Sequence, residues 1–215
     1  MVSFNLDDGW DSGYEKGLPM FEAASIKISY YISTLYLQYP GFITPEQLLD
    51  IRSRGHEIGS HARNHDDLSG LPEAQMKSDI NGGKQDLADL GIDAPMFAYP
   101  YGGANAQVVQ AVKDAGYIAA RGASGGYNDA TTDRYMLYAW NLNSSMTFGA
   151  AKAIIDQAAA ENKWVIFVMH KVDETGTDDT NVTSEVLQQI INYVQEKNID
   201  VVTNTEGLAR LSGLE

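Results

Sequence analysis

The sequence contains no cysteine, which excludes disulfide bonds and thiolate chemistry. Basic residues are also scarce: 15 lysines and arginines stand against 29 aspartates and glutamates, so the formal net charge is −14 at pH 7. Because binding to nucleic acid needs a basic surface, we expect no nucleic-acid partner. A neutral or cationic ligand is easier to reconcile with this charge.

Long apolar runs are absent as well. A membrane-spanning helix needs about 20 consecutive apolar residues, and no run in this chain approaches that length, so we expect no transmembrane segment. The N-terminus carries no signal-peptide pattern. The chain begins almost inside its first expected strand, and we therefore expect an excised domain or a mature form that can belong to a larger multidomain protein.

The 215 residues are 44% apolar, a composition that suits one globular domain over residues 1–215. Strand and helix patterns alternate along the whole length. Strands are expected over 3–6, 26–33, 56–60, 95–99, 117–121, 135–142, 164–169 and 199–203, and helices over 14–24, 45–55, 72–90, 105–115, 147–162, 184–197 and 206–211, with polar loops over 122–133 and 175–180. This alternation predicts an α/β fold, a distorted or incomplete (β/α) barrel, with a doubly wound open sheet as the alternative.

Unusual polar and aromatic residues follow most of the expected strands. Since functional side chains of a parallel barrel lie at the C-terminal ends of its strands, we expect these groups to meet at one mouth. They are Asp7 and Asp8, His61 and His65, Tyr99 to Gly103, Arg121, Trp140 and His170.

The pair His61 and His65 is the strongest local signal. Spacing i, i+4 places two imidazoles on one face of a helical turn, and two histidines with one aspartate form a donor set that suits Zn²⁺. Two surface histidines are the alternative. The segment from His56 to His61 has one residue too many for an HExxH zinc motif, and His56 is expected to be structural.

The other candidates each have a plainer interpretation. Asp7-Asp8-Gly9 is typical of a turn, although a nearby cation would allow both carboxylates to stay ionised. His170 follows an apolar strand and is either a core histidine or a general acid. Tyr101-Gly102-Gly103 forms a tight turn or presents a backbone N–H to an oxyanion. Trp140 belongs to the core or to the wall of an apolar pocket.

Five motifs occur in order: Asp7-Asp8-Gly9, Ser60-His61-x-x-x-His65, Tyr99-Pro100-Tyr101-Gly102, Trp140 and Val168-Met169-His170. Over nearly the whole chain they resemble the polysaccharide deacetylases with a NodB homology domain, carbohydrate esterase family 4. The resemblance implies a distorted (β/α)7 barrel in a single domain. It also implies one divalent metal ion, zinc first, with cobalt or nickel as alternatives.

The resemblance further implies a role for each matched residue. Asp8 would bind the metal with His61 and His65, and Asp7 would be the general base.

The remaining matched residues would handle the substrate. The backbone N–H of Tyr101 would bind the oxyanion and His170 would be the general acid. Trp140 would line the acetyl pocket, and Val168 and Trp10 would contact the substrate.

Two departures from the family pattern affect the catalytic groups. Ala98 occupies the position of an arginine that commonly orients the base, and we expect Arg121 to replace it. The acid that tunes the catalytic histidine is also missing, since Ala139 precedes the motif tryptophan and Lys171 follows the motif histidine.

The sequence therefore predicts a metal-dependent carbohydrate deacetylase. An N-acetylglucosamine-based glycan (chitin-type, peptidoglycan or biofilm polymer) is the first choice of substrate, and acetylxylan is the rival. A non-catalytic carbohydrate-binding barrel and a hydrolase of small amides or imides are the other interpretations. A secreted or cell-envelope location of bacterial type is expected from the family.

Overall fold

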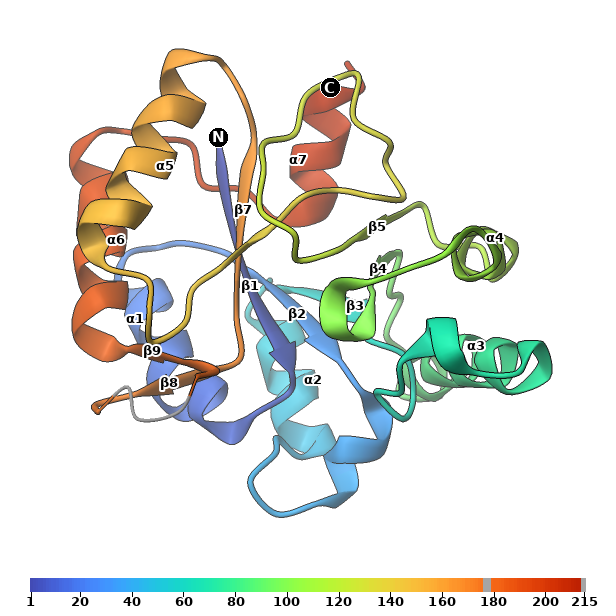
Figure 1. Ribbon diagram of the computed structural model, residues 1–215. Coiled ribbons are helices and arrows are strands. Elements are labelled where there is room, and N and C mark those ends of the chain that lie inside the picture. The colour runs from blue at the N-terminus through green and yellow to red at the C-terminus, as the bar shows by residue number, and fades with distance from the viewer. Residues whose placement is uncertain (176–178, 214–215) are drawn as a thin grey trace.

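Seven parallel strands form one curled sheet at the centre of the molecule. The computed structural model describes residues 1–175 and 179–213. The strands are β1 Val2–Asp8, β2 Ser29–Ile32, β3 Glu57–Ser60, β4 Met96–Ala98, β5 Ala119–Arg121, β6 Trp140–Asn141 and β7 Val165–Met169. Their order is β5-β4-β3-β2-β1-β7-β6, so β1 is an interior strand that pairs with β2 on one side and β7 on the other (Figure 1).

Beyond β5 the sheet is extended by part of the segment between β5 and β6, which runs parallel to β5 through a bridge between Leu137 and Arg121. Leu137 donates its backbone N–H to Ala120 (3.0 Å) and accepts the N–H of Gly122 (2.9 Å). The predicted distorted (β/α)7 barrel is confirmed.

Helices surround the outside of this sheet (Figure 1). They are α1 Leu18–Ala23, α2 Pro45–Ser53, α3 Glu73–Asp89, α4 Ala106–Asp114, α5 Phe148–Ala160, α6 Ser184–Glu196 and α7 Asn204–Leu211, with short turns η1 Gly13–Gly17, η2 Thr34–Gln38, η3 Leu68–Gly70 and η4 Pro100–Gly102. The predicted start of α2 is confirmed: Thr44 and Gln47 form a reciprocal capping box and Pro45 is the first helical residue. No helix in the described part of the chain is long and apolar enough to cross a membrane.

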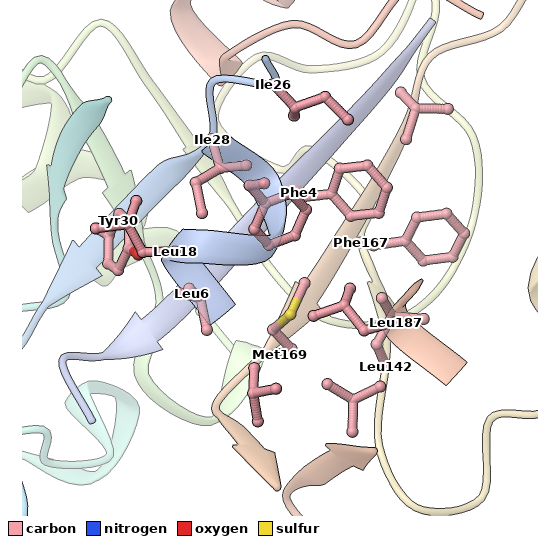
Figure 2. Close-up of a cluster of buried hydrophobic side chains, with 14 of the residues drawn as sticks. Phe4, Leu6, Leu18, Ile26, Ile28, Tyr30, Leu142, Phe167, Met169 and Leu187 are labelled. Carbon is pink, nitrogen blue, oxygen red and sulfur yellow. The ribbon is translucent and has the colours of Figure 1, made fainter. Parts of the chain in front are cut away.

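Strand β1 separates two environments because successive side chains point to opposite faces. Phe4 and Leu6 pack outward into the largest apolar cluster, where the ring of Phe4 lies 5.2 Å from that of Phe21 and 6.0 Å from that of Phe167 (Figure 2). Ser3, Asn5 and Asp7 occupy the other face and make polar contacts in the barrel interior. The polar face of β1 ends in the functional site.

Two expected strands are wrong. The strand expected over 135–142 is reduced to the two residues of β6, and the strand expected over 199–203 contributes only a bridge between Val201 and Val2. A small sheet of β8 Lys171–Asp173 and β9 Asn181–Thr183 was not predicted. The polar loop predicted over 175–180 lies partly outside the described residues, at 176–178.

Candidate active site

The end of β1 carries two carboxylates that a tight turn aims at the same place. Asp8 has a left-handed backbone (φ 69°), as does Gly9 (φ 93°), and the Gly9 N–H donates to the carbonyl of Asp7 (2.8 Å). Because the chain turns here, the side chains of Asp7 and Asp8 do not point to opposite faces of the sheet, as neighbours in a regular strand would. As a result, Nε2 of His61 lies 3.8 Å from Asp7 Oδ2 and 3.5 Å from Asp8 Oδ1.

His61 and His65 meet, but not on a helical turn as the spacing predicted. Residues 61–65 form an irregular loop, in which Ala62 (φ 62°) and His65 (φ 60°) both adopt left-handed backbone conformations. The two imidazole rings end 4.8 Å apart. Strained backbone of this kind persists only where the surroundings enforce it.

Helix α3 enforces the conformation of this loop. The buried carboxylate of Asp79 accepts the backbone N–H groups of Arg63 (2.8 Å) and Asn64 (2.7 Å). A glycine at position 83 permits close approach, since a Cβ there would lie 2.6 Å from the carbonyl carbon of Ala62.

Asp8, His61 and His65 present three donor atoms within 4.8 Å of one another. His65 Nε2 lies 3.1 Å from Asp8 Oδ1 and His61 Nε2 lies 3.5 Å from it, close to the spacing of about 3.3 Å between ligands of a tetrahedral zinc ion. The carbonyl of Ala98 accepts a hydrogen bond from His61 Nδ1 (2.8 Å), which fixes the tautomer and leaves the Nε2 lone pair toward the site.

The electrostatics of this triad also suit a cation. Apart from the two candidate imidazole ligands, no described residue offers a hydrogen-bond donor to the buried Asp8 Oδ1. Although burial alone would raise the pKa of Asp8, the adjacent imidazoles lower it below its usual value. Burial lowers the pKa of His61 to about 4, so this imidazole is a neutral ligand at pH 7. The buried anionic oxygen of Asp8, beside the neutral imidazole of His61, fits a divalent metal ion.

Trp10 contacts Asp8, one of these three candidate ligands. Its indole N–H donates to Asp8 Oδ2 (2.9 Å), and its ring stacks on Phe42 at 4.2 Å. The structure therefore supports Trp10 as an orienting partner of Asp8; its predicted contact with substrate stays a prediction.

Arg121 contacts Asp7, as predicted from the missing family arginine. Ala98 on β4 pairs in register with Arg121 on β5, so the guanidinium group comes from the strand next to the expected one. Both side chains of the ion pair are almost fully buried, and Arg121 Nη2 donates to Asp7 Oδ1. Nε of Arg121 donates to Asn5 Oδ1 (2.9 Å), and the guanidinium carbon lies 4.6 Å from the centre of the Tyr31 ring. Sequence analysis missed Asn5 and Tyr31.

A cavity of about 260 Å³ collects most of the predicted residues. Its lining comprises Asp7, His61, Tyr99, Tyr101, Gly102, Arg121, Ala123, Asn141, Val168 and His170. Strand ends from β1, β3, β4, β5, β6 and β7 thus meet at one mouth, as expected for a parallel barrel.

Trp140 is not among the described residues that line this cavity, and its predicted place in an acetyl pocket stays a prediction. Its indole N–H donates to the carbonyl of Gly126 (2.8 Å), and its ring covers Gly125. The next residue, Asn141, lines the cavity instead. The sequence indicates Asn141 as a cavity residue only through its position directly after the motif residue Trp140.

Two curated relatives resemble the chain. A putative polysaccharide deacetylase, YxkH of Bacillus subtilis (strain 168), is 22% identical over 156 residues, which cover 72% of this chain and 56% of the relative. A gellan lyase of a Bacillus species is 22% identical over 213 residues, covering 89% of this chain but 8% of the relative. The chain thus spans about half of the first relative and a small part of the second.

Solved structures share the fold. The Xyl-CE4 domain of a multidomain xylanase from the hindgut metagenome of Trinervitermes trinervoides has a TM-score of 0.66 at 18% identity, covering 99% of this chain and 90% of that chain. The peptidoglycan deacetylase PdaC of Bacillus subtilis has a TM-score of 0.63 at 17% identity, covering 96% of this chain and 88% of that chain. A mutant of BA3943, a CE4 family pseudoenzyme, has a TM-score of 0.63 at 15% identity, covering 96% of this chain and 66% of that chain.

The family comparison agrees with the motifs at the mouth of the barrel. A family model for polysaccharide deacetylases matches residues 1–120, which include both carboxylates, both histidines and the Tyr101 turn. The chain belongs to the polysaccharide deacetylase family, the carbohydrate esterase family 4 group with a NodB homology domain.

Proposed function

We propose that the protein is a metal-dependent deacetylase of an N-acetylglucosamine-based poly- or oligosaccharide. The observation that carries the proposal is the convergence on one cavity of a carboxylate held by a buried arginine (Asp7 with Arg121) and an imidazole at the end of the adjacent strand β7 (His170). A candidate metal triad adjoins them. A binding module would need neither a base nor an acid, which favours an enzyme over the non-catalytic interpretation.

Asp8, His61 and His65 would hold the cation, and the N,N,O donor set favours zinc. When bound, the cation would supply Lewis acidity toward an acetyl carbonyl and would lower the pKa of water.

The remaining steps belong to side chains of the cavity. Arg121 donates a hydrogen bond to Oδ1 of Asp7. The other carboxylate oxygen, Oδ2, therefore accepts the proton of the attacking water. The N–H of Tyr101 donates to the developing oxyanion, where a donor is worth most in a site that excludes water. His170 donates its proton to the nitrogen of the departing amine. Val168 contributes apolar surface for the acetyl methyl group.

The first test measures acetate release from chitooligosaccharides and from acetylxylan. Asp7→Asn keeps the shape of the carboxylate and removes its basicity, so kcat should fall by about 10²- to 10⁴-fold. Asp50→Asn, a change in a surface ion pair with Arg54, is the matched control and should keep full activity. If Asp7→Asn releases acetate at the parent rate, the mechanism is wrong, and if no acetylated sugar is hydrolysed, the enzyme interpretation fails. Faster release from acetylxylan would make the esterase the correct member of the class.

The metal is tested separately from turnover. Calorimetric titration with Zn²⁺ should give one site per chain, and His65→Ala should abolish it because it removes one of three ligands. Chelation should stop acetate release, and Zn²⁺, Co²⁺ or Ni²⁺ should restore it. A chelated protein that keeps its full rate would contradict metal dependence.

Arg121 is tested as the partner of the base. Arg121→Ala leaves the Asp7 carboxylate buried without its cation, so kcat should fall by about 10²-fold while KM changes little. A profile equal to the parent would remove Arg121 from the mechanism.

The surroundings of the enzyme follow from the same proposal. Since the chain spans only part of its curated relatives, we place residues 1–215 as the catalytic domain of a larger multidomain protein. We place that protein outside the cell or at the bacterial cell envelope, where acetylated glycans are found.

A further inference from the structure

A row of buried amide side chains extends from Arg121 to the first residue of the C-terminal helix. Asn5 Oδ1 accepts hydrogen bonds from Arg121 Nε (2.9 Å) and from Asn204 Nδ2 (2.9 Å). Asn5 Nδ2 donates in return to Asn204 Oδ1 (3.0 Å). Both asparagines are completely buried. The oxygen that holds Arg121 is therefore itself oriented by Asn204.

Asn204 also reaches the other side of the guanidinium group. Its Nδ2 donates to the hydroxyl of Tyr31 (2.8 Å), and the ring of Tyr31 is the surface over which the Arg121 guanidinium lies. One side chain thus touches both groups that flank Arg121: the acceptor of its Nε and the ring under its face.

Asn204 is itself fixed in place. Its backbone N–H donates to Ser29 Oγ (3.0 Å), and the preceding residue, Thr203, caps α7 in a reciprocal box with Glu206. Ser3, two residues before Asn5 on the same face of β1, donates to the carbonyl of Val202 (2.6 Å). The start of α7 and the segment before it are therefore tied to β2 through Ser29 and to β1 through Ser3, and Asn204 cannot shift without breaking several hydrogen bonds.

We propose that Asn5 and Asn204 are positioning residues that act through Arg121 to hold the Asp7 carboxylate in its catalytic orientation. This role rests on the proposed deacetylase function. It makes the start of α7, some 200 residues from Asp7 in the sequence, a component of the site. The role is needed here because Arg121 reaches Asp7 from β5, and its long side chain needs fixed partners along its length to stay in one rotamer.

The direct test observes Arg121 itself. In ¹⁵N-labelled protein the Arg121 Nε–H resonance is identified by its loss in Arg121→Lys. Asn204→Ala should shift this resonance and accelerate its exchange with solvent by at least about tenfold, because the acceptor on Asn5 loses its own support. Asn128→Ala is the matched control: Asn128 is an equally buried asparagine that bonds to Tyr138 and Trp164, so its loss costs stability but should leave the resonance unchanged.

The kinetic test separates positioning from stability. Asn204→Ala should lower kcat for acetate release by about tenfold with KM unchanged, whereas Asn128→Ala should alter neither. In an Arg121→Ala background the Asn204→Ala change should have no further effect on kcat, because its effect passes through the guanidinium group. Should Asn204→Ala fail to fold, Tyr31→Phe, which removes one hydroxyl and keeps the ring, should shift the Arg121 resonance and lower kcat in the same direction.

Two results would overturn the proposal. One is an unchanged Arg121 resonance and kcat in folded Asn204→Ala or in Tyr31→Phe; the other is a loss in kcat that adds fully to that of Arg121→Ala. Failure of the proposed function looks different: the parent would release no acetate while the Arg121 resonance still responded to Asn204→Ala, so the structural linkage would stand without the deacetylase.

Discussion

At the scale of single residues, ionisable side chains are buried in this protein in two ways, either as an ion pair or in their neutral form. Arg121 and Asp7 are buried as an ion pair with further hydrogen bonds, which offsets the cost of removing charges from water. His56, at the N-terminal end of β3, is buried, and its acidic neighbour Glu22 lies at the edge of contact, with Oε1 3.9 Å from His56 Nε2. Its Nδ1 accepts the backbone N–H of Ile28 (3.2 Å), and burial lowers its pKa to about 4, so it is held neutral.

His56 should therefore make the protein less stable in mild acid. The pKa of His56 in the folded state lies below the usual value of about 6.5. Between pH 6.5 and pH 4, His56 is therefore protonated in the unfolded chain and neutral in the folded chain. The free energy of unfolding should fall as the pH is lowered through this window, with no further loss from this group below about pH 4. Near pH 5.5, where few carboxylates titrate, the loss should be about 1 kcal/mol.

His56→Asn provides the comparison, since its Oδ1 can accept the Ile28 N–H but does not titrate. Urea unfolding at pH 7.5 and at pH 5.5 should show a smaller decrease in this variant than in the parent. Equal decreases would mean that His56 is protonated in the folded state or is not the responsible group.

At the scale of elements, local signals predicted helices better than strands. Caps, prolines and closing glycines are encoded within a few residues, and α2 begins with the predicted Thr44 box. Strand limits depend on partners far away in the sequence. The stretch over 135–142 has strand-forming residues, but it pairs as a strand only at Trp140 and Asn141, because the rest of it lies along β5 as a loose edge.

The same distinction separates the site residues that were predicted from those that were not. Asp8 ends β1 and His170 directly follows β7, so the expected fold class was enough to place them at the mouth of the barrel. Asn204 and Asn5 are ordinary polar residues in the sequence, and only the three-dimensional packing brings them to Arg121. A motif position does not fix the direction of a side chain, so the predicted place of Trp140 in an acetyl pocket stays a prediction.

Helix α3 provides an element-scale prediction. Gly83 permits the helix backbone to approach the His61–His65 loop, where an added Cβ would lie 2.6 Å from Ala62. Gly83→Ala should therefore push the loop away from its strained conformation. We expect Zn²⁺ affinity to fall by at least about tenfold and the free energy of unfolding to fall by 1–3 kcal/mol, roughly the cost of overpacking.

Gly149 in α5 is the matched control for this prediction. A Cβ there meets only Thr147 Oγ1, at 3.9 Å, so Gly149→Ala should stabilise the protein by about 0.5–1 kcal/mol through helix propensity alone. Zn²⁺ titration and thermal unfolding of both variants measure the difference. Unchanged zinc affinity in Gly83→Ala would show that the loop holds its shape without the close helix contact.

At the scale of the whole molecule, charge should influence which glycans remain bound. The whole chain carries a net charge of −14, and the cavity lies where strand ends from across the chain converge. Fully acetylated N-acetylglucosamine oligomers are neutral, but each acetyl group removed exposes an amine that is cationic below its pKa. The field of an acidic protein attracts such chains, so partly deacetylated oligomers should bind more tightly than neutral ones at low salt.

Salt should separate the two kinds of substrate. Raising NaCl from about 0.02 M to about 0.3 M shortens the Debye length severalfold, so KM for partly deacetylated oligomers should rise by about threefold or more, while KM for fully acetylated oligomers should hardly change. Neutral acetylxylan serves as a second uncharged reference. If both kinds of oligomer respond equally to salt, the acidic surface does not act at the mouth, and selection among glycans must come from contacts within the cavity. A response confined to the cationic oligomers would mean that the acidic surface strengthens the binding of partly deacetylated chains.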